Sequence, residues 1–247
     1  KLFNERKVFF FTFQGTRDRA KNVFINDVKI QSESDFIIPQ EIPSVFDLLY
    51  WEKVVITNIN IIKQRLCMFK KEFIQLRNIQ HVKISNTNLF ENEIPIMSGG
   101  SIFLIKICQE VEISSLKFRK NQFRDVTMRT NADFYLTSFS KVDSLVLKDH
   151  VIEDNIFGSV TRLFFVQDTS DSNVKISVES ADITIANNTM DDSNSITSGR
   201  LAMPTFSFLE IQGSLLNSFT VDQITIKENK LCGRIFAINL FETLTFI

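Results

Sequence analysis

Two acidic residues, Asp149 and Asp182, are the strongest candidates for chemistry in this sequence. They occupy the same place in a pattern that recurs along the chain, so stacked repeats would place them one coil apart. Two carboxylates at such a short distance can bind a calcium ion or share a proton. Lys148 is a base next to Asp149 in the sequence. Because Asp is also a residue that turns prefer, we expect the two residues to form turns. A catalytic role for them is the alternative.

The remaining groups that could do chemistry are few and scattered. His81 and His150 are the only histidines and lie far apart in the repeat pattern. Cys67, Cys108 and Cys232 have no CxxC spacing and are expected to be buried free thiols. No hydrolase, Walker, zincin or dinucleotide motif occurs, so the sequence predicts no catalytic residue, no metal ligand and no cofactor. Polar insertions, expected to be solvated loops, hold five further candidate oxygen ligands: Asp168, Asp171, Asn173, Asp191 and Asp192.

The pattern itself is thirteen residues long, and its clearest copies run over residues 111–123 and 219–231. Relative to a polar anchor at position zero, apolar residues recur at −10, −8, −5, −3 and +2. Four copies have a polar residue at one of these places, namely Asp35, Thr87, His150 and Ser180. Anchors that recur at 28 to 41 residues indicate a stacked-repeat architecture. The anchors are Glu33, Gln64, Asn92, Asn121, Asn155, Asn188 and Asn229.

Two-residue spacing is the period of a β-strand, so each apolar pair predicts a short strand with one face inward. The gap at −6 then has to bend the chain, so that both pairs face one core. No single copy can bury its apolar face alone, whereas parallel stacking about 4.8 Å apart forms continuous inward columns. Further apolar segments predict a second wall: residues 101–107, 132–139, 162–167, 205–211 and 234–240.

The segments at residues 115–123 (SLKFRKNQF), 182–190 (DITIANNTM) and 223–231 (QITIKENKL) resemble the repeat of pectin-lyase-like right-handed parallel β-helix proteins. The resemblance implies an all-β, single-stranded, right-handed solenoid of about seven coils, with residues 1–247 as one domain. It also implies that the recurring asparagines face inward and bond to one another as a ladder: Asn92, Asn121, Asn155, Asn188 and Asn229. Since that family includes enzymes that cleave acidic polysaccharides, a lyase or hydrolase using Asp149, Asp182 and Lys148 is one alternative function.

The residues at position −1 are expected to face solvent. Their charges mostly alternate from coil to coil, which predicts a ladder of surface ion pairs that sets the register. They are Lys63, Glu91, Lys120, Asp154, Asn187 and Glu228. Asn187 also begins an Asn-Asn-Thr sequon, so it is a candidate glycosylation site if the chain is secreted.

Composition limits the partners. With 28 basic and 29 acidic residues there is no bulk charge to attract nucleic acid, and no apolar run approaches the roughly 20 residues of a membrane span. Abundant Phe and scarce Gly suggest an AT-rich genome, such as that of a protist. The strand-like segments at residues 7–13 and 244–247 predict that the solenoid is a fragment that continues into further coils, or abuts another protein chain.

We therefore expect a non-enzymatic structural or adhesive module of a large extracellular or cell-surface assembly. Its expected partners are other protein chains or further coils of the same chain, and possible ligands include glycans. Besides the polysaccharide lyase or hydrolase, a glycan-binding module that uses loop aromatics is the other alternative.

Overall fold

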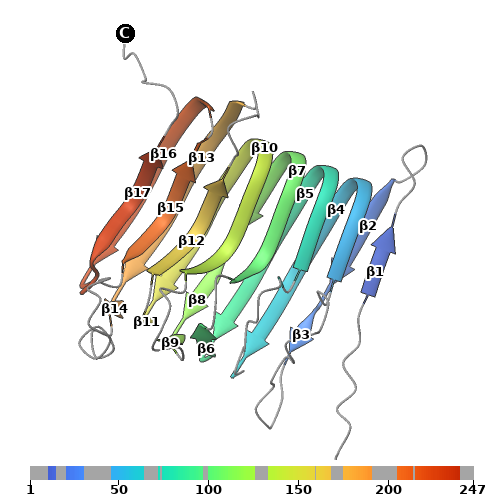
Figure 1. The fold of residues 1–247 in the computed structure, drawn as a ribbon. Helices are drawn as coiled ribbons and strands as arrows, with labels where there is room; N and C mark the ends of the chain where they lie inside the picture. Colours follow the sequence, from blue (N-terminus) through green and yellow to red (C-terminus); the bar gives the residue numbers. More distant parts are fainter. Residues whose placement is uncertain are drawn as a thin grey trace, which may run out of the picture.

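The computed structural model describes residues 11–14, 21–30, 46–63, 72, 74–96, 100–125, 133–158, 160–167, 175–190, 205–213 and 215–239. Every regular element in these ranges is a β-strand, and all strand pairs are parallel. The strands lie side by side from blue β1 to red β17, as rungs of a solenoid (Figure 1). The predicted all-β parallel solenoid is confirmed.

Long strands run round a bend and so contribute to two walls. One sheet has the order β1-β4-β5-β7-β10-β12-β15-β17, with β2, β3, β8, β13 and β16 paired alongside, and a smaller sheet has the order β14-β11-β9-β6. The bounds are β1 Phe11–Gln14, β2 Asn22–Asn26, β3 Lys29–Ile30, β4 Phe46–Ile62, β5 Ile74–Phe90, β6 Glu93–Ile96, β7 Gly100–Ser114, β8 Lys117–Arg119, β9 Gln122–Asp125, β10 Asp133–Glu153, β11 Ile156–Phe157, β12 Val160–Gln167, β13 Lys175–Ala186, β14 Thr189–Met190, β15 Phe206–Gln212, β16 Leu215–Lys227 and β17 Gly233–Asn239.

The solenoid has about five turns, fewer than the seven that were expected. Five of the seven anchors, from Asn92 to Asn229, lie in described coils. The coils of the first four reach the smaller sheet. The coil of Asn229 reaches the same wall through the isolated bridge between Thr189 and Lys230. The anchors Glu33 and Gln64 lie outside the described residues. The N-terminal strands β1 to β4 join the large sheet, but the described part does not complete their turns.

Each bend places one residue in the left-handed region of backbone space. At position −6 the φ angles lie between 48° and 60°, and at −1 they lie between 53° and 56°. Asn, Asp and Ser are frequent at −6, which fits the tolerance of Asn and Asp for this conformation. A third bend, which the sequence did not predict, has φ angles of 56° to 62° at Tyr50, Asn78, Ile107 and Lys141.

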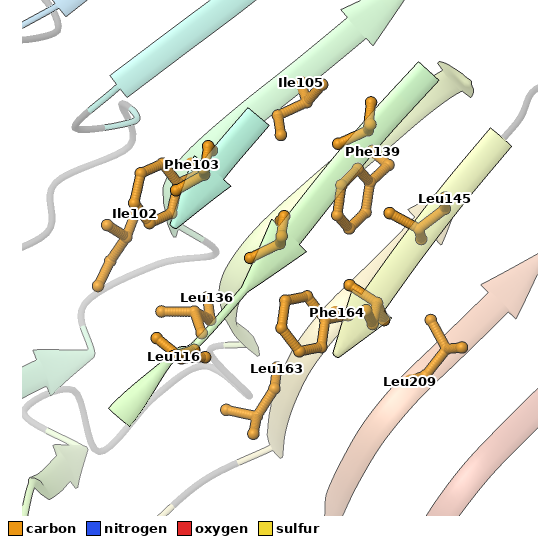
Figure 2. Packing of buried hydrophobic residues seen from close by; sticks show 14 of the residues in the cluster. Ile102, Phe103, Ile105, Leu116, Leu136, Phe139, Leu145, Leu163, Phe164 and Leu209 are labelled. Atoms are coloured by element: carbon orange, nitrogen blue, oxygen red, sulfur yellow. The ribbon is translucent and has the colours of Figure 1, made fainter. Parts of the chain in front are cut away.

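The core consists of columns of apolar side chains, one per coil. At position −3 the column contains Ile61, Leu89, Phe118, Ile152 and Ile185, none more than 1% exposed. Aromatic rings from successive coils pack on one another, for example Phe139 on Phe164 at 6.4 Å between centroids (Figure 2). These contacts hold each coil to the next, because most of the apolar surface is buried between neighbouring coils and little is buried within a single coil.

Polar residues predicted at inward places are buried too. Thr87, His150 and Ser180 are at most 2% exposed, and in the described structure Thr87 Oγ1, His150 Nε2 and Ser180 Oγ have no hydrogen-bond partner. Of the cysteines, Cys108 is a buried free thiol as expected. Cys232 is a free thiol but is exposed, because it lies on the last described coil. The prediction that it would be buried was therefore wrong. Cys67 lies outside the described residues.

Candidate functional site: the asparagine ladder and the C-terminal end face

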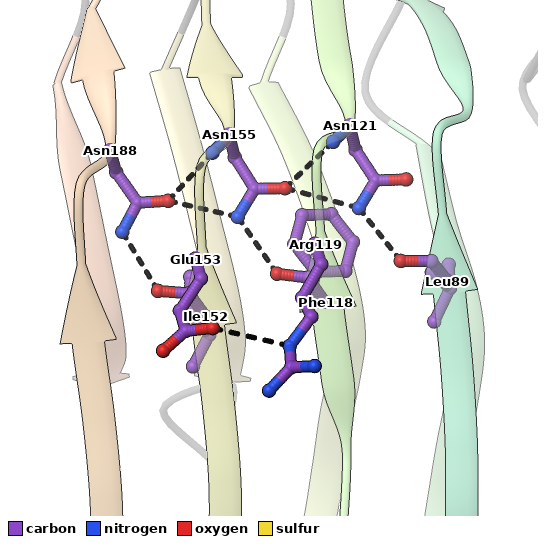
Figure 3. Close-up of polar contacts among 8 residues, drawn as sticks. All are labelled: Leu89, Phe118, Arg119, Asn121, Ile152, Glu153, Asn155 and Asn188. Atoms are coloured by element: carbon purple, nitrogen blue, oxygen red, sulfur yellow. Dashed lines mark hydrogen bonds and ion pairs between the residues drawn. The ribbon is translucent and has the colours of Figure 1, made fainter.

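The asparagines at position zero form one continuous hydrogen-bonded stack. The Nδ2 atom of each donates to Oδ1 of the asparagine in the next coil, at 2.9 Å from Asn92 to Asn121 and 3.1 Å from Asn121 to Asn155. The stack continues at 2.9 Å from Asn155 to Asn188 and 2.9 Å from Asn188 to Asn229. Figure 3 shows its central part. All five predicted ladder residues are therefore brought together.

Each ladder amide also satisfies backbone groups at the bend. Asn155 Nδ2 donates to the carbonyl of Phe118 in the preceding coil at 2.8 Å, while Asn155 Oδ1 accepts from the backbone N–H of Asn121 at 2.9 Å (Figure 3). Asn121 Nδ2 and Asn188 Nδ2 likewise donate to the carbonyls of Leu89, at 3.0 Å, and Ile152, at 2.9 Å. Because buried peptide groups without partners are costly, the ladder lets the chain turn inside the core.

In the described part of the chain, the ladder ends at Asn229. Its Nδ2 donates to the carbonyl of Ile185 at 2.7 Å and, where the other asparagines bond to the next coil, to the carbonyl of Lys227 in its own coil at 2.9 Å. The backbone N–H of Asn188 donates to Oδ1 of the next ladder residue, Asn229. In the described structure the backbone N–H of Asn229 makes no such bond. The end of the stack thus keeps a donor for a further side-chain oxygen.

Among the described residues the apolar columns end in the same coil. Its inward residues form what we call the C-terminal end face: Phe219, Val221, Ile224, Ile226 and Leu231. Val221 is 41% exposed and Ile226 is 53% exposed, whereas their counterparts one coil earlier, Ser180 and Ile185, are fully buried. In the described part β16 pairs only with β13, and β17 only with β15. The end face therefore combines exposed apolar side chains with free strand edges, a combination that favours pairing with another strand.

Ion pairs join neighbouring coils on the outer surface. Among the −1 residues, all of which are described, only Lys63 and Glu91 form an ion pair with one another, at 3.5 Å. The prediction of a charge ladder at −1 was therefore wrong beyond that pair. Lys120, for instance, lies over the ring of Phe90, at 5.6 Å from its centroid.

Other surface positions carry the ion pairs instead. Glu112 lies between Lys83, at 3.1 Å, and Lys148, at 3.4 Å, while Arg119 pairs with Glu153 at 3.3 Å. Burial alone would raise the pKa of Glu112, but the two ammonium groups hold it below its ordinary value. These exposed pairs favour one register, and each contributes at most about 1 kcal/mol.

The structure places the candidate catalytic residues at the surface bends. Asp149 and Asp182 are exposed, with φ angles of 57° and 53°, and Lys148 contacts Glu112. No group of three or more His, Cys, Asp or Glu in the described ranges is arranged to hold a metal ion. The loop candidates Asp168, Asp171, Asn173, Asp191 and Asp192 lie outside those ranges.

The two histidines and the sequon residue lie in different surroundings. His150 is buried against Phe164, with ring centroids 5.3 Å apart, and burial lowers its pKa to about 3. Its Nδ1 accepts from the backbone N–H of Leu116 at 3.4 Å, so the ring is neutral. His81 lies in the outer surface, 2.9 Å from Glu110. Asn187 is exposed beside the buried Asn188, so its amide is accessible at a bend.

One polar cluster was missed by sequence reasoning. On β10, β12 and β15, Arg162 lies over the stacked rings of Tyr135 and Phe165, and its Nε donates to Glu210 at 2.6 Å. Ser207 and Gln212 also donate to Glu210, and Phe165 is only 5% exposed. The cluster joins three coils, and its Phe165 ring is covered while Tyr135 is half-buried. Tyr135 and Arg162, at outward positions of the second wall, were the sequence signal that could have indicated this cluster.

The described ranges contain no helix of the length and hydrophobicity needed to cross a bilayer. In comparisons with known proteins, no family model, no curated protein and no solved structure matches the chain. The parallel β-solenoid therefore rests on the strand pairing itself, and the pectin-lyase-like resemblance rests on the repeat motif alone.

Proposed function

We propose that the chain is a non-enzymatic structural or adhesive module of a large extracellular or cell-surface assembly, in which further β-coils stack on the C-terminal end face. The observation that carries the proposal is the uncovered end of the inward columns at Val221 and Ile226. Every earlier described member of these two columns, from Ile56 and Ile61 onward, is at most 4% exposed.

The energetics favour such stacking. Fully burying a large aliphatic side chain contributes about 1.5–3 kcal/mol, and the free edge of β16 can pair without rearrangement because its strand is already extended. In a solenoid each coil is stabilised mainly by its two neighbours. The last coil has one described neighbour, so adding a coil gains the contacts that interior coils already make.

The surface location and the source are part of the same proposal. The motif resemblance supports a right-handed, pectin-lyase-like β-helix, and the Phe-rich, Gly-poor composition supports a protist source. The ladder and the inter-coil ion pairs give regularity along the axis, a property that suits a fibre, wall or adhesive stalk. Glycans attached at Asn187 would project from a bend without entering the core.

Antibody labelling and sedimentation test this proposal. An antibody against the chain should label intact source cells without permeabilisation, and the chain in gentle surface extracts should sediment as a large assembly. Labelling only after permeabilisation, with the chain sedimenting alone, would contradict the proposal. Turnover of a uronate polymer that is lost when Asp149 and Asp182 are both changed to Asn would contradict its non-enzymatic part.

A further inference from the structure

Exposed large apolar side chains concentrate in the two terminal described coils. Phe24 on β2 is 70% exposed, and on β16 Val221 is 41% and Ile226 is 53% exposed. The other two such residues, Ile107 and Ile156, lie singly in middle coils, where isolated exposed apolar residues are normal. Phe24 faces outward, but the inward columns lose cover at both described ends, because Val23, Ile25 and Val28 are only partly buried where Val54, Ile56 and Ile59 are at most 1% exposed.

The two ends also share one register. Val23 pairs with Val54 at the start of a column that continues through Val82, Val111, Leu145 and Val178 to Phe219. In the described part β2 pairs only with β4, and β16 only with β13, so each presents a free edge of the same polarity. A second copy displaced along the axis would bring β2 beside β16 as one more parallel pair.

The side chains match in that register. The apolar columns continue without interruption, because Val23, Ile25 and Val28 are all partly buried residues that already pack against the core. No like charges meet, and the amides of Asn26 and Gln223 can donate to the facing carboxylates. The facing pairs are Val23 with Phe219, Phe24 with Thr220, Ile25 with Val221, Asn26 with Asp222, Asp27 with Gln223, Val28 with Ile224, and Lys29 with Thr225.

The bend at −6 is prepared for such a contact. Asn86 Nδ2 donates to Asn58 Oδ1 at 3.2 Å, and Asn58 Nδ2 donates to Asp27 Oδ1 at 2.9 Å. Donors in this row point toward the N-terminal coil, where the row ends in a carboxylate that can accept further bonds. The Gln223 amide of another copy would be the donor that extends the row.

We propose that the C-terminal end face binds the N-terminal coil of a second copy of this chain, head to tail and in continuous register. The inference rests on the proposed function, because it names the partner of the same end face. The two contacting surfaces are different, so the interface is heterologous, and repeating it without closure gives an open filament.

Sedimentation velocity of the purified chain over a wide range of concentration tests the proposal. We expect the mass to rise with concentration in multiples of 28.5 kDa. Ile226→Asn and Ile25→Asn should each weaken self-association about tenfold or more, since each puts a polar amide into an apolar contact. Ile107→Asn is the matched control, because Ile107 is 52% exposed yet far from both ends, and it should leave association unchanged.

Mixing the two variants identifies the geometry. Each variant retains one intact end, so an equimolar mixture should form heterodimers that do not grow further. If Ile25→Asn disturbs the fold by circular dichroism, Phe24→Ser takes its place, because Phe24 is 70% exposed. A chain that stays monomeric, or associates regardless of these changes, overturns the inference. If such a chain is still found in a surface assembly, the proposed function stands and another coil is the partner.

Discussion

Changing Asn155 to Ala tests whether the ladder holds the coils together. The side chain accepts from Asn121 N at 2.9 Å and Asn121 Nδ2 at 3.1 Å, and donates to Phe118 O at 2.8 Å and Asn188 Oδ1 at 2.9 Å. Its removal deprives the buried Asn121 N–H and Phe118 carbonyl of these partners. At about 1–3 kcal/mol for each buried group left without a partner, the expected loss is about 2–6 kcal/mol.

That loss is a large fraction of the roughly 5–15 kcal/mol typical of a folded domain. Asn229→Ala is the matched control, because it removes the same kind of contacts at the half-buried end of the ladder, where water can replace them. There we expect a loss of about 1 kcal/mol. Asn155→Asp, which keeps the side-chain volume, should be at least as harmful as Asn155→Ala, because an oxygen replaces the donor that faces two acceptors.

Urea unfolding gives the free energies, and native-state hydrogen exchange gives the local effect. In Asn155→Ala the amide of Asn121 should exchange faster, whereas in Asn229→Ala the affected amide should be that of Asn188. If Asn155→Ala cost no more stability than Asn229→Ala, or if the Asn121 amide stayed equally protected, the ladder would not be what holds the coils together.

Three further predictions concern single residues. Because burial lowers the folded-state pKa of His150 to about 3, the unfolded chain binds its proton first as pH falls. Stability should therefore be fully present above about pH 6.5 and decline by up to about 5 kcal/mol toward pH 3, and urea unfolding of His150→Leu should show a flatter pH profile. Gly233 has a φ angle of 144°, and an added Cβ would collide with the backbone of Phe206. Gly233→Ala should thus cost about 1–3 kcal/mol and speed hydrogen exchange in β17, and unchanged exchange there would count against the observed backbone. Burial raises the pKa of Cys108 to about 12, whereas Cys232 is exposed; a thiol reagent should label Cys232 in the native chain while sparing Cys108, and equal labelling rates would contradict this difference in burial.

The apolar columns could be predicted because a two-residue period is a local signal, whereas the asparagine ladder was expected from the resemblance of the repeat to pectin-lyase-like β-helix proteins. The bends at −6 were predictable for a similar reason, since Asn58, Asn86, Asp149 and Asp182 are residue types that turns favour. These features repeat from coil to coil, so each copy reinforced the interpretation of the others.

The third bend could not be predicted, because the residue types there carry no consistent turn signal. Ile107 and Lys141 have left-handed backbones that neighbouring coils impose through parallel pairing on both sides of the bend. Some of the inter-coil ion pairs follow the columns, because Lys83 with Glu112 and Arg119 with Glu153 are direct register partners. Glu112 also contacts Lys148 diagonally, two residues from its register partner Val146, and an alignment of columns alone misses that pair.

Electron cryomicroscopy of the assembly extracted from source cells can show whether the C-terminal end face receives another β-coil. We expect a strand paired in parallel with β16 at about 4.8 Å, burial of Val221 and Ile226, and a side-chain oxygen that accepts from the Asn229 backbone N–H. A β16 edge that faces solvent throughout the assembly, or that is covered by a helix, would contradict this expectation.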